Sequence, residues 1–398
     1  MSVHAQGFTF FDRQVQIHGF ASQGFVHTNE NNWLTMNTSN VGSGEFTDFG
    51  ANASAQITDN FHVGAQIYDR NLGQLGRWHP SLDWGFADYR FAPWLGVRGG
   101  KVKTTLGLFN DTQDLDFLHP FALLPQSIYP TDLRDTTIAH LGGDIYGSLP
   151  LPRSLGDVAY TAYVGHRSDS IHSGIAYVAS QYNFHYSSYG GLQYGGDLRW
   201  KTRLKGLQIG VSRMDQDLSA TAKFINPLNP DGGFILDNEH SKTDWTNQFY
   251  GEYILGKLRI DSEYRRFVND QAEEVAGSVI LDTKSDVRGC YVAGSYRIVK
   301  RITLGSYYSR YSITRASTGP LAPLFPDQTD TSLPANHIYD KVITARVGLN
   351  KFWNIKVEGH FMNGYGDSTY PDGFYPQQNP QGFRPNTNAL VLKSSLNF

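Results

Sequence analysis

The sequence is poor in the features that mark soluble metal-binding proteins, helical membrane proteins and nucleic-acid-binding proteins. Its single cysteine, Cys290, excludes an intrachain disulfide framework and any zinc site with two or more cysteines. No run approaches the roughly 18–20 apolar residues of a membrane helix. The net charge is −3, which gives no nucleic-acid signature, so we expect no nucleic-acid partner.

Motifs of catalysis are also missing. The chain has no G-x-S-x-G, no HExxH and no phosphate-binding loop, and its His and Ser residues are scattered. We therefore predict a protein that is not an enzyme and needs no cofactor. Sequence alone leaves open a Ser and a His that meet only in the folded barrel, as in an outer-membrane hydrolase.

The first residues lack the basic region and apolar stretch of a signal peptide. Val3-His4-Ala5 nevertheless fits the small-residue end of a cleaved signal. We expect residues 1–14 to form an N-terminal segment that includes such a remnant, and residues 15–398 to form a single domain.

Aromatic residues and glycine are abundant in a chain of low hydropathy. There are 23 Tyr, 24 Phe, 7 Trp and 41 Gly in 398 residues, and the mean hydropathy is −0.40. This combination is typical of strands with one apolar and one polar face, joined by polar turns. Transmembrane barrels show this pattern because each strand alternates between lipid and lumen.

Period-two segments recur from near residue 15 to the last residue, and we count about sixteen of them. Short connections of roughly 2–8 residues alternate with long polar ones. The long connections lie near residues 28–44, 71–80, 109–137, 167–188, 216–242, 269–285, 313–338 and 366–387. A soluble sandwich has no reason to place a long loop at every second connection, whereas a membrane barrel has short turns at one end and long loops at the other. We predict an all-β, closed antiparallel transmembrane barrel of about 16 strands.

The long connection 109–137 is the third, between the fifth and sixth predicted strands. Phe117, Leu118, Phe121, Leu123, Leu124 and Tyr129 give it more apolar surface than a solvated loop would carry. A barrel of sixteen strands has a lumen too wide for side chains to fill. We therefore expect this loop to fold into the lumen and narrow it.

Two motifs and the loop position resemble Gram-negative outer-membrane porins. The last segment alternates Leu390, Leu392 and Leu396 and ends in Phe398, similar to the terminal aromatic signal that the barrel assembly machinery reads. Gly100-Lys101-Val102-Lys103, followed by Gly107, resembles a strand of porins related to the phosphate-selective family. The resemblance implies a trimeric diffusion channel in the bacterial outer membrane, in contact with lipid and lipopolysaccharide, that passes small hydrophilic solutes or ions.

Charged residues in strands belong on the lumen side, since a charge facing lipid costs roughly 2–4 kcal/mol at the midplane. This predicts a basic wall at the constriction, with modest anion preference, although each base could simply pair with a neighbouring acid. Gly99-Gly100 could form a bulge that shifts the register of this wall. Its members are Arg98, Lys101, Lys103, Arg199, Arg259, Arg265 and Arg346.

The loop itself carries Asp111, Asp114, Asp116 and Asp135, with Arg134 as its opposing base. Packed in the lumen, these carboxylates would face the basic wall across water and set up a transverse field. The simpler reading is that they cap turns. Calcium at Asp111, Asp114 and Asp116 is a further alternative, although the glycine and distal glutamate of an EF-hand are missing. A plugged barrel acting as receptor or adhesin, an outer-membrane hydrolase and a soluble all-β protein remain the competing functions.

Overall fold

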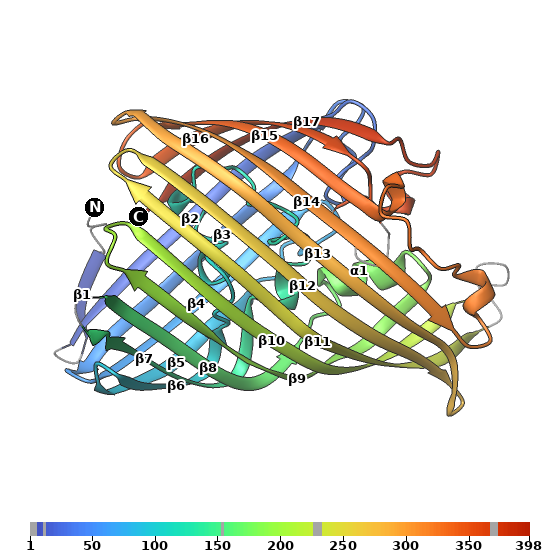
Figure 1. Cartoon of the computed structure of the whole chain (residues 1–398), viewed down its shortest axis with the longest axis horizontal. Helices are drawn as coiled ribbons and strands as arrows, with labels where there is room; N and C mark the ends of the chain where they lie inside the picture. The colour runs from blue at the N-terminus through green and yellow to red at the C-terminus, as the bar shows by residue number, and fades with distance from the viewer. Residues whose placement is uncertain (1–5, 11–12, 153–154, 226–232, 367–372) are drawn as a thin grey trace.

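Neighbouring antiparallel strands pair all the way round the molecule and close it into a barrel (Figure 1). The computed structural model describes residues 6–10, 13–152, 155–225, 233–366 and 373–398. Within these ranges sixteen strands form the ring, β2 to β17, with β17 paired to β2 and β9 to β10. The sixteen strands predicted from the sequence each overlap one of them. In order they are β2 (Arg13–Thr28), β3 (Ser43–Thr58), β4 (Phe61–Leu72), β5 (Ser81–Ala92), β6 (Leu95–Lys103), β7 (Ala139–Pro150), β8 (Gly156–Ser168), β9 (Phe184–Thr202), β10 (Leu207–Ile225), β11 (Phe234–Leu255), β12 (Leu258–Val275), β13 (Ser278–Val299), β14 (Ile302–Thr318), β15 (His337–Gly348), β16 (Trp353–Asn363) and β17 (Asn386–Asn397).

An additional strand, β1 (Gln6–Phe10), pairs with the start of β2. The expected N-terminal segment 1–14 is therefore partly folded, and β2 begins at Arg13 rather than near residue 15. Val3-His4-Ala5, the expected signal remnant, lies outside the described residues. Both termini lie at the end of the barrel that carries the short turns (Figure 1).

The barrel has an apolar outside and a polar inside. On β17, Leu390, Leu392 and Leu396 are 43%, 39% and 48% exposed, whereas Lys393 between them is 7% exposed. The same alternation runs round the ring, and Lys356 and Glu358 are fully buried. A soluble protein would not expose so many large apolar side chains while burying its charges. In hydrocarbon the arrangement is the expected one, because closure also satisfies every strand edge.

The wall is much taller on one side. Strands β9 to β14 have 17 to 22 residues, whereas β15 to β17 have 11 or 12. The predicted long loops at 216–242 and 269–285 were therefore wrong. The first consists mostly of β10, up to Ile225, and β11, from Phe234, and the second is strand with a tight turn at Ala276-Gly277, where φ is 52° and 76°. On β10 above the apolar belt, Leu218, Ala220 and Ala222 face inward and polar residues face outward, so the strand lacks the apolar outer face of a lipid-facing strand.

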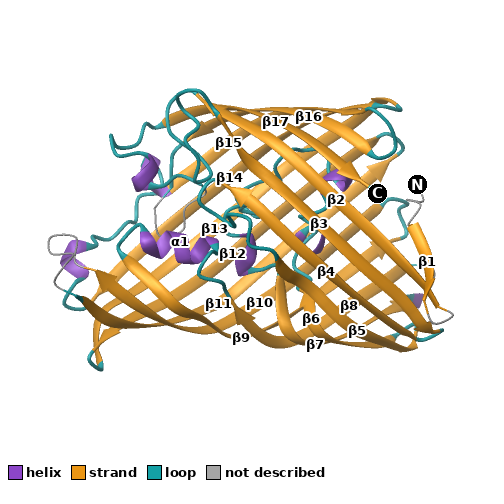
Figure 2. Cartoon of the chain, turned by 180° about the vertical axis from the view of Figure 1, so that it is seen from behind, coloured by secondary structure: helices purple, strands orange, loops and turns teal. Residues whose placement is uncertain are grey.

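Helical structure is confined to connections at the long-loop end and to the lumen (Figure 2). The only α-helix in the described parts of the chain is α1 (Gly174–Ser180), between β8 and β9. Single 3₁₀ turns occur at η1 (Asn110–Thr112), η2 (Asp116–Leu118), η3 (Arg134–Thr136), η6 (Ala322–Leu324), η7 (Pro334–Asn336) and η8 (Pro376–Gln378). Among these described helices, none has the length and apolarity to span a membrane.

The boundary between apolar belt and polar extension can be tested on one strand pair. Val292 is 60% exposed on the outer face of β13, whereas Ala316 faces outward on β14 opposite Lys284. We expect Val292→Arg to destabilise the barrel by about 2–4 kcal/mol, whereas Ala316→Glu, whose carboxylate would stand opposite Lys284, should not destabilise it. Urea unfolding in lipid vesicles measures both, and equal effects would contradict the assigned boundary.

Candidate functional site

The connection between β6 and β7, residues 104–138, lies inside the barrel (Figure 2). It joins the fifth and sixth strands of the ring, as predicted, and extends slightly beyond the expected 109–137. Leu108, Phe109, Phe121, Leu124 and Tyr129 are buried against Tyr250, Tyr291 and Tyr307 of the inner wall. Leu118 is the exception among the predicted apolar residues, at 48% exposed. We call residues 104–138 the lumen loop.

The first attachment of the lumen loop is to β16 and β17. The Asp116 carboxylate is 2.9 Å from Lys356 Nζ and 3.2 Å from Lys393 Nζ, and it accepts a hydrogen bond from Ser395. Lys356 also donates to the carbonyls of Asp116 and Phe121, at 2.7 and 2.8 Å. These bonds hold the 3₁₀ turn at 116–118 directly against the wall.

Burial alone would raise the pKa of Asp116, but Lys356 and Lys393 outweigh it and hold the pKa below its ordinary range. Next to this ion pair, Glu358 accepts hydrogen bonds from the backbone N–H groups of Ala122 and Leu123, at 2.9 and 3.1 Å. Breaking a buried pair of this kind by removing one partner typically costs about 3–5 kcal/mol. The attachment is therefore a fixed part of the fold.

The second attachment is to β4, β5 and β6, further round the ring from the first. Asp114 is 2.5 Å from Lys103 Nζ and accepts a hydrogen bond from Gln66 at 2.7 Å. Arg134 of the loop donates to Asp83 of β5 at 2.8 Å. Burial opposes ionisation of Asp114, yet Lys103 and Arg134 lower its pKa.

Arg70 of β4 completes the second attachment. Its guanidinium is 2.9 Å from Asp135 and donates to the carbonyl of Thr131 at 2.6 Å. Asp132 is fully buried and accepts from the hydroxyl of Tyr375 in the last long loop. Burial raises the pKa of Asp132 to about 6, because the hydrogen bond from Tyr375 only partly offsets the loss of solvent.

The third attachment is to β9, β10 and β12. Glu263 accepts from the backbone N–H of Leu108 at 3.0 Å and from the hydroxyl of Tyr129 at 2.7 Å. Arg199 donates to the carbonyl of Gly107 at 2.9 Å, and Ser212 accepts from the Gly107 N–H at 2.9 Å. The loop is thus bonded to the wall on three sides and spans the lumen.

Four of the seven predicted wall bases touch the loop. Besides Lys103 and Arg199, Arg346 donates to the carbonyl of Phe117 at 3.2 Å. Arg259 lies 5.0 Å from the centre of the Phe109 ring and pairs with Glu252 and Asp261 on its own wall. Asp114 and Asp116 contact basic side chains of the wall directly instead of facing them across water, and the bases that hold Asp116, Lys356 and Lys393, are not among the seven predicted.

The remaining predicted residues lie elsewhere. Arg98 faces inward and pairs with Asp88 at 3.3 Å, near the start of β6. Lys101 is a correction: residues three apart in a strand face opposite sides, and Lys101 stands opposite Leu141, which is 62% exposed. Lys101 therefore lies on the outer face and donates to the carbonyl of Leu82.

The other two are Asp111 and Arg265. The Asp111 backbone accepts from Lys103, and burial raises the pKa of its carboxyl although Arg199 and Lys103 oppose this. Arg265 faces the lumen on β12 and lines the space described next.

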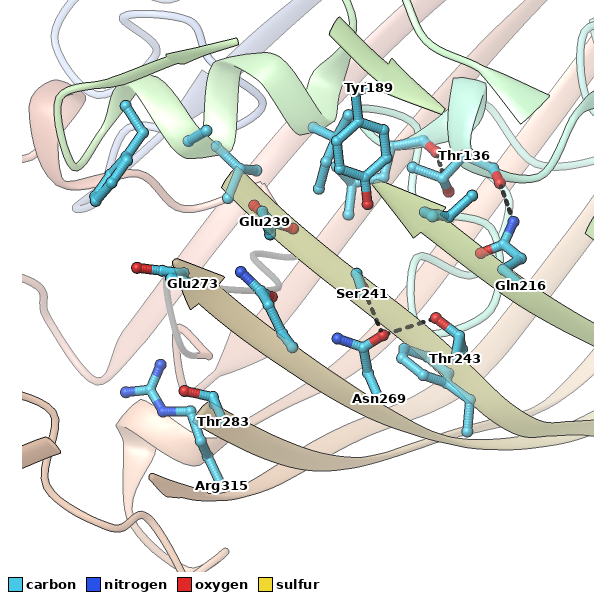
Figure 3. Close-up of a pocket in the computed structure, with 18 of the residues that line it drawn as sticks. Thr136, Tyr189, Gln216, Glu239, Ser241, Thr243, Asn269, Glu273, Thr283 and Arg315 are labelled. Atoms are coloured by element: carbon cyan, nitrogen blue, oxygen red, sulfur yellow. Dashed lines mark hydrogen bonds between the residues drawn. The ribbon is translucent and has the colours of Figure 1, made fainter. Parts of the chain in front are cut away.

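A cavity of about 430 Å³ remains between the lumen loop and the tall wall (Figure 3). We call it the vestibule. Its floor includes Ser127, Leu133 and Thr136 of the lumen loop, and α1 covers one side. Inward side chains of β10 to β14 line the other side, among them Gln216, Glu239, Asn269, Glu273 and Thr283. Near Asp114 and Asp116 on the opposite side of the loop only about 60 Å³ is open.

The short side of the barrel is filled. Trp33 and Leu34 of the first long connection and Phe374 of the last are buried in one apolar cluster with Leu123 of the lumen loop and Val391 of β17. Trp33 also stands edge-on to His360, with ring centres 5.1 Å apart. The cavity of about 430 Å³ beside the tall wall is therefore much larger than the 60 Å³ that is open near Asp114 and Asp116.

These geometric features can be compared with known proteins. No family model matches the chain, and no curated protein matches it in sequence. Solved structures do match over nearly the whole length. The outer membrane protein OmpT of Vibrio cholerae superimposes with a TM-score of 0.56 at 11% identity, covering 99% of this chain and 100% of that chain. The chain has the porin fold.

Two further porin-fold neighbours are OmpF of Salmonella typhi and the anion-selective porin of Comamonas acidovorans. OmpF gives a TM-score of 0.53 at 13% identity, with 99% of this chain and 100% of that chain covered. The Comamonas porin gives 0.51 at 10% identity, with 97% and 100% covered. At these identities the likeness establishes the barrel architecture.

Three buried side chains of this barrel are linked in the order of a catalytic triad, with a hydroxyl, an imidazole and a carboxylate. Thr104 Oγ1 is 3.0 Å from His140 Nδ1, and His140 Nε2 is 2.9 Å from Asp144. All three are at most 2% exposed, and Gln193 also donates to the Thr104 hydroxyl. The network fixes the point where the lumen loop leaves β6, and its hydroxyl has no route to a substrate.

Metal ligands are not gathered at the loop. Asp114 and Asp116, two of the three candidates for calcium, are engaged by lysine and arginine side chains. Among the described residues, no group of three or more His, Cys, Asp or Glu side chains could hold a metal ion.

Sequence reasoning missed several residues of the site. Arg70 and Asp83 were not singled out, although each bonds the loop, and Glu263 was expected only as a lumen-facing partner of wall bases. Asp237, Glu239 and Glu273 of the vestibule fell in segments assigned to loops. Their signal was the period-two spacing Asp237, Glu239, Ser241, Thr243, which places all four on one face of a strand.

The seat of the loop on β13 can be tested at Gly289. A Cβ there would lie 2.0 Å from the Ser127 carbonyl oxygen, whereas a Cβ at Gly294 of the same strand meets nothing within 4 Å. We expect Gly289→Ala to push the lumen loop away from β13 and to lower the free energy of unfolding by about 1–3 kcal/mol. Hydrogen exchange at residues 120–132 should become several-fold faster. Gly294→Ala is the control. Unchanged exchange in Gly289→Ala would show that the loop is not seated on this strand.

Asp132 predicts a pH dependence. Its pKa is raised from an ordinary 3.8 to about 6, so the folded state binds a proton more tightly than the unfolded state. Ionisation of Asp132 therefore lowers the free energy of unfolding as pH rises from 4 through 6, by up to roughly 3 kcal/mol above pH 6. We expect Asp132→Asn to gain stability relative to the parent at pH 7.5 and to lose that advantage at pH 4. Urea unfolding in detergent at both pH values tests this, with Asp59→Asn, in an exposed turn, as the control. The same difference in stability between Asp132→Asn and the parent at both pH values would contradict the raised pKa of Asp132.

Proposed function

We propose that the protein is a porin of the bacterial outer membrane that lets small hydrophilic solutes or ions diffuse passively. The observation that supports this most is the divided lumen. A closed barrel with an apolar exterior holds a fixed loop, and the loop leaves a cavity of about 430 Å³, lined by both polar and apolar side chains, beside the tall wall. A water-filled path along β9 to β14 follows as part of the proposal.

The charge arrangement changes the expected selectivity. Arg199 and Arg259 are paired with acids on their own strands, and Lys103 is paired within the second attachment. The supposed surplus of wall bases is thus largely neutralised at the loop. In the proposal, any anion preference rests on bases that face the vestibule, of which Arg265 is the clearest.

Contact with lipopolysaccharide and lipid is part of the same proposal. The register places Arg213, Arg266 and Arg288 at one level on the outer face of β10, β12 and β13, with Asn247 between the first two. Exposed arginines directly above an apolar belt suit phosphate groups of a lipid surface.

Assembly as a homotrimer is also proposed, and one structure of the V. cholerae OmpT neighbour is described as a trimer form. For insertion by the barrel assembly machinery, the proposed signal is Phe398. Its backbone pairs with Gly19 of β2, and its ring lies over that glycine.

The second candidate is a plugged barrel that acts as a receptor or adhesin. Attachment of the loop on three sides, together with the filled short side, favours it. An outer-membrane hydrolase has weaker support, because the one Thr–His–Asp arrangement described above is closed to substrates.

Planar-bilayer recording decides between channel and plug. We expect purified protein to give stepwise conductance in KCl, whereas a plugged barrel gives none. In a salt gradient, Arg265→Glu should shift the reversal potential toward cation preference. Arg266→Glu, a neighbour on the outer face, should leave it unchanged. Equal shifts of the reversal potential in Arg265→Glu and Arg266→Glu would show that the vestibule is not part of the conduction path.

A further inference from the structure

Three carboxylates lie together at the outer end of the vestibule. Asp237 and Glu239 are two residues apart on the inner face of β11, and Glu273 of β12 stands directly opposite Glu239 in the register. Figure 3 shows Glu239 and Glu273 on adjacent strands beside the cavity. Like charges directly opposite each other on neighbouring strands destabilise a sheet. This placement calls for a compensating positive charge.

No ion pair supplies that charge. Within the described ranges, Asp237, Glu239 and Glu273 form no ion pair with a lysine, arginine or histidine, although Arg167 and Arg315 line the same cavity. Asp237 is 1% exposed, and its Oδ1 atom, at the cavity lining, accepts no hydrogen bond. Glu239 accepts one bond, from the hydroxyl of Tyr186. A buried carboxylate oxygen without a partner carries a desolvation cost that a ligand could offset.

Aromatic side chains line the same part of the cavity. Tyr182, Phe184, Tyr186 and Tyr189 come from the segment after α1 and the start of β9, and Phe267 comes from β12. Aromatic faces attract cations and also bury apolar groups. A small metal ion does not fit this lining, since no three of the described carboxylates converge closely enough to ligate one. A larger cation with a hydrocarbon part can contact both the carboxylates and the rings.

We propose that the outer vestibule binds organic ammonium ions that carry an aromatic group. The ammonium lies among Asp237, Glu239 and Glu273, and the ring packs against the tyrosines at the start of β9. As a route of uptake this rests on the proposed channel function, whereas the binding itself does not. The two can therefore fail separately.

Titration calorimetry of the whole protein in detergent tests the binding without any need for conduction. Three probes share a 4-hydroxyphenyl ring and differ in the group at the other end. Tyramine carries a cationic ammonium, tyrosol a neutral hydroxyl and 4-hydroxyphenylacetate an anionic carboxylate. We expect tyramine to bind at least tenfold more tightly than tyrosol, and 4-hydroxyphenylacetate to show no binding. Equal affinity for tyramine and tyrosol would overturn the proposal.

Matched variants locate the site. Asp237→Asn and Glu273→Gln should each weaken tyramine binding at least fivefold. Glu274→Gln should not, because Glu274 lies one residue further on, opposite Asn238 and Val279, and faces outward. Intact barrel folding in each variant is checked by the heat-dependent shift in gel mobility. Unchanged binding in both folded inner-face variants would contradict the assigned carboxylates.

In bilayers, tyramine added on the long-loop side should cause brief current blocks that are lost in Glu273→Gln. Stepwise conductance with no binding of tyramine in calorimetry would overturn this inference and leave the channel standing. Binding of tyramine without stepwise conductance would overturn the channel proposal and leave this inference standing.

Discussion

The ion pairs between the lumen loop and the inner wall are the interaction on which the rest of the site depends. Asp116 between Lys356 and Lys393, and Asp114 between Lys103 and Arg134, hold the loop to different strands of the wall. Buried charges hold only when each has its partner in place, so the loop has one position against the wall. A ring of sixteen strands leaves a lumen that side chains cannot fill, and these contacts determine which part of it stays open.

The height of the wall follows from the same division. On the short side, three connections meet in an apolar cluster around Trp33 and Phe374, and strands β15 to β17 end at that level. On the tall side a cavity of about 430 Å³ remains inside β10 to β14, lined by polar and apolar side chains. The strands there continue, with a tight turn at Ala276-Gly277. One side is thus closed by packed loops, and the other holds the open cavity.

The sequence was sufficient for the barrel and for the position of the loop, because lipid imposes a strict alternation on every spanning strand. It failed where that constraint ends. Above the belt, the outer face of β10 to β13 is no longer a continuous apolar stripe, and 216–242 and 269–285 read as loops although they continue these strands. Lys101 was assigned to the lumen because strand charges were expected there, but the register of β6 with β7 runs through Gly99-Gly100 without a shift and leaves Lys101 on the outer face. Partners of the loop, such as Glu263 and Arg70, depend on tertiary contacts that no local pattern encodes.

The wall charges therefore divide into two classes that the sequence could not separate. Charges bonded to the loop are neutralised and structural, so they contribute little field in the open part of the lumen. Three carboxylates that face the vestibule, Asp237, Glu239 and Glu273, form no ion pair within the described chain. A fixed loop cannot adjust to a passing solute, so discrimination must come from the groups that already face the opening. Selectivity in this barrel is then decided on the tall wall, above the loop, where the sheet places like charges side by side.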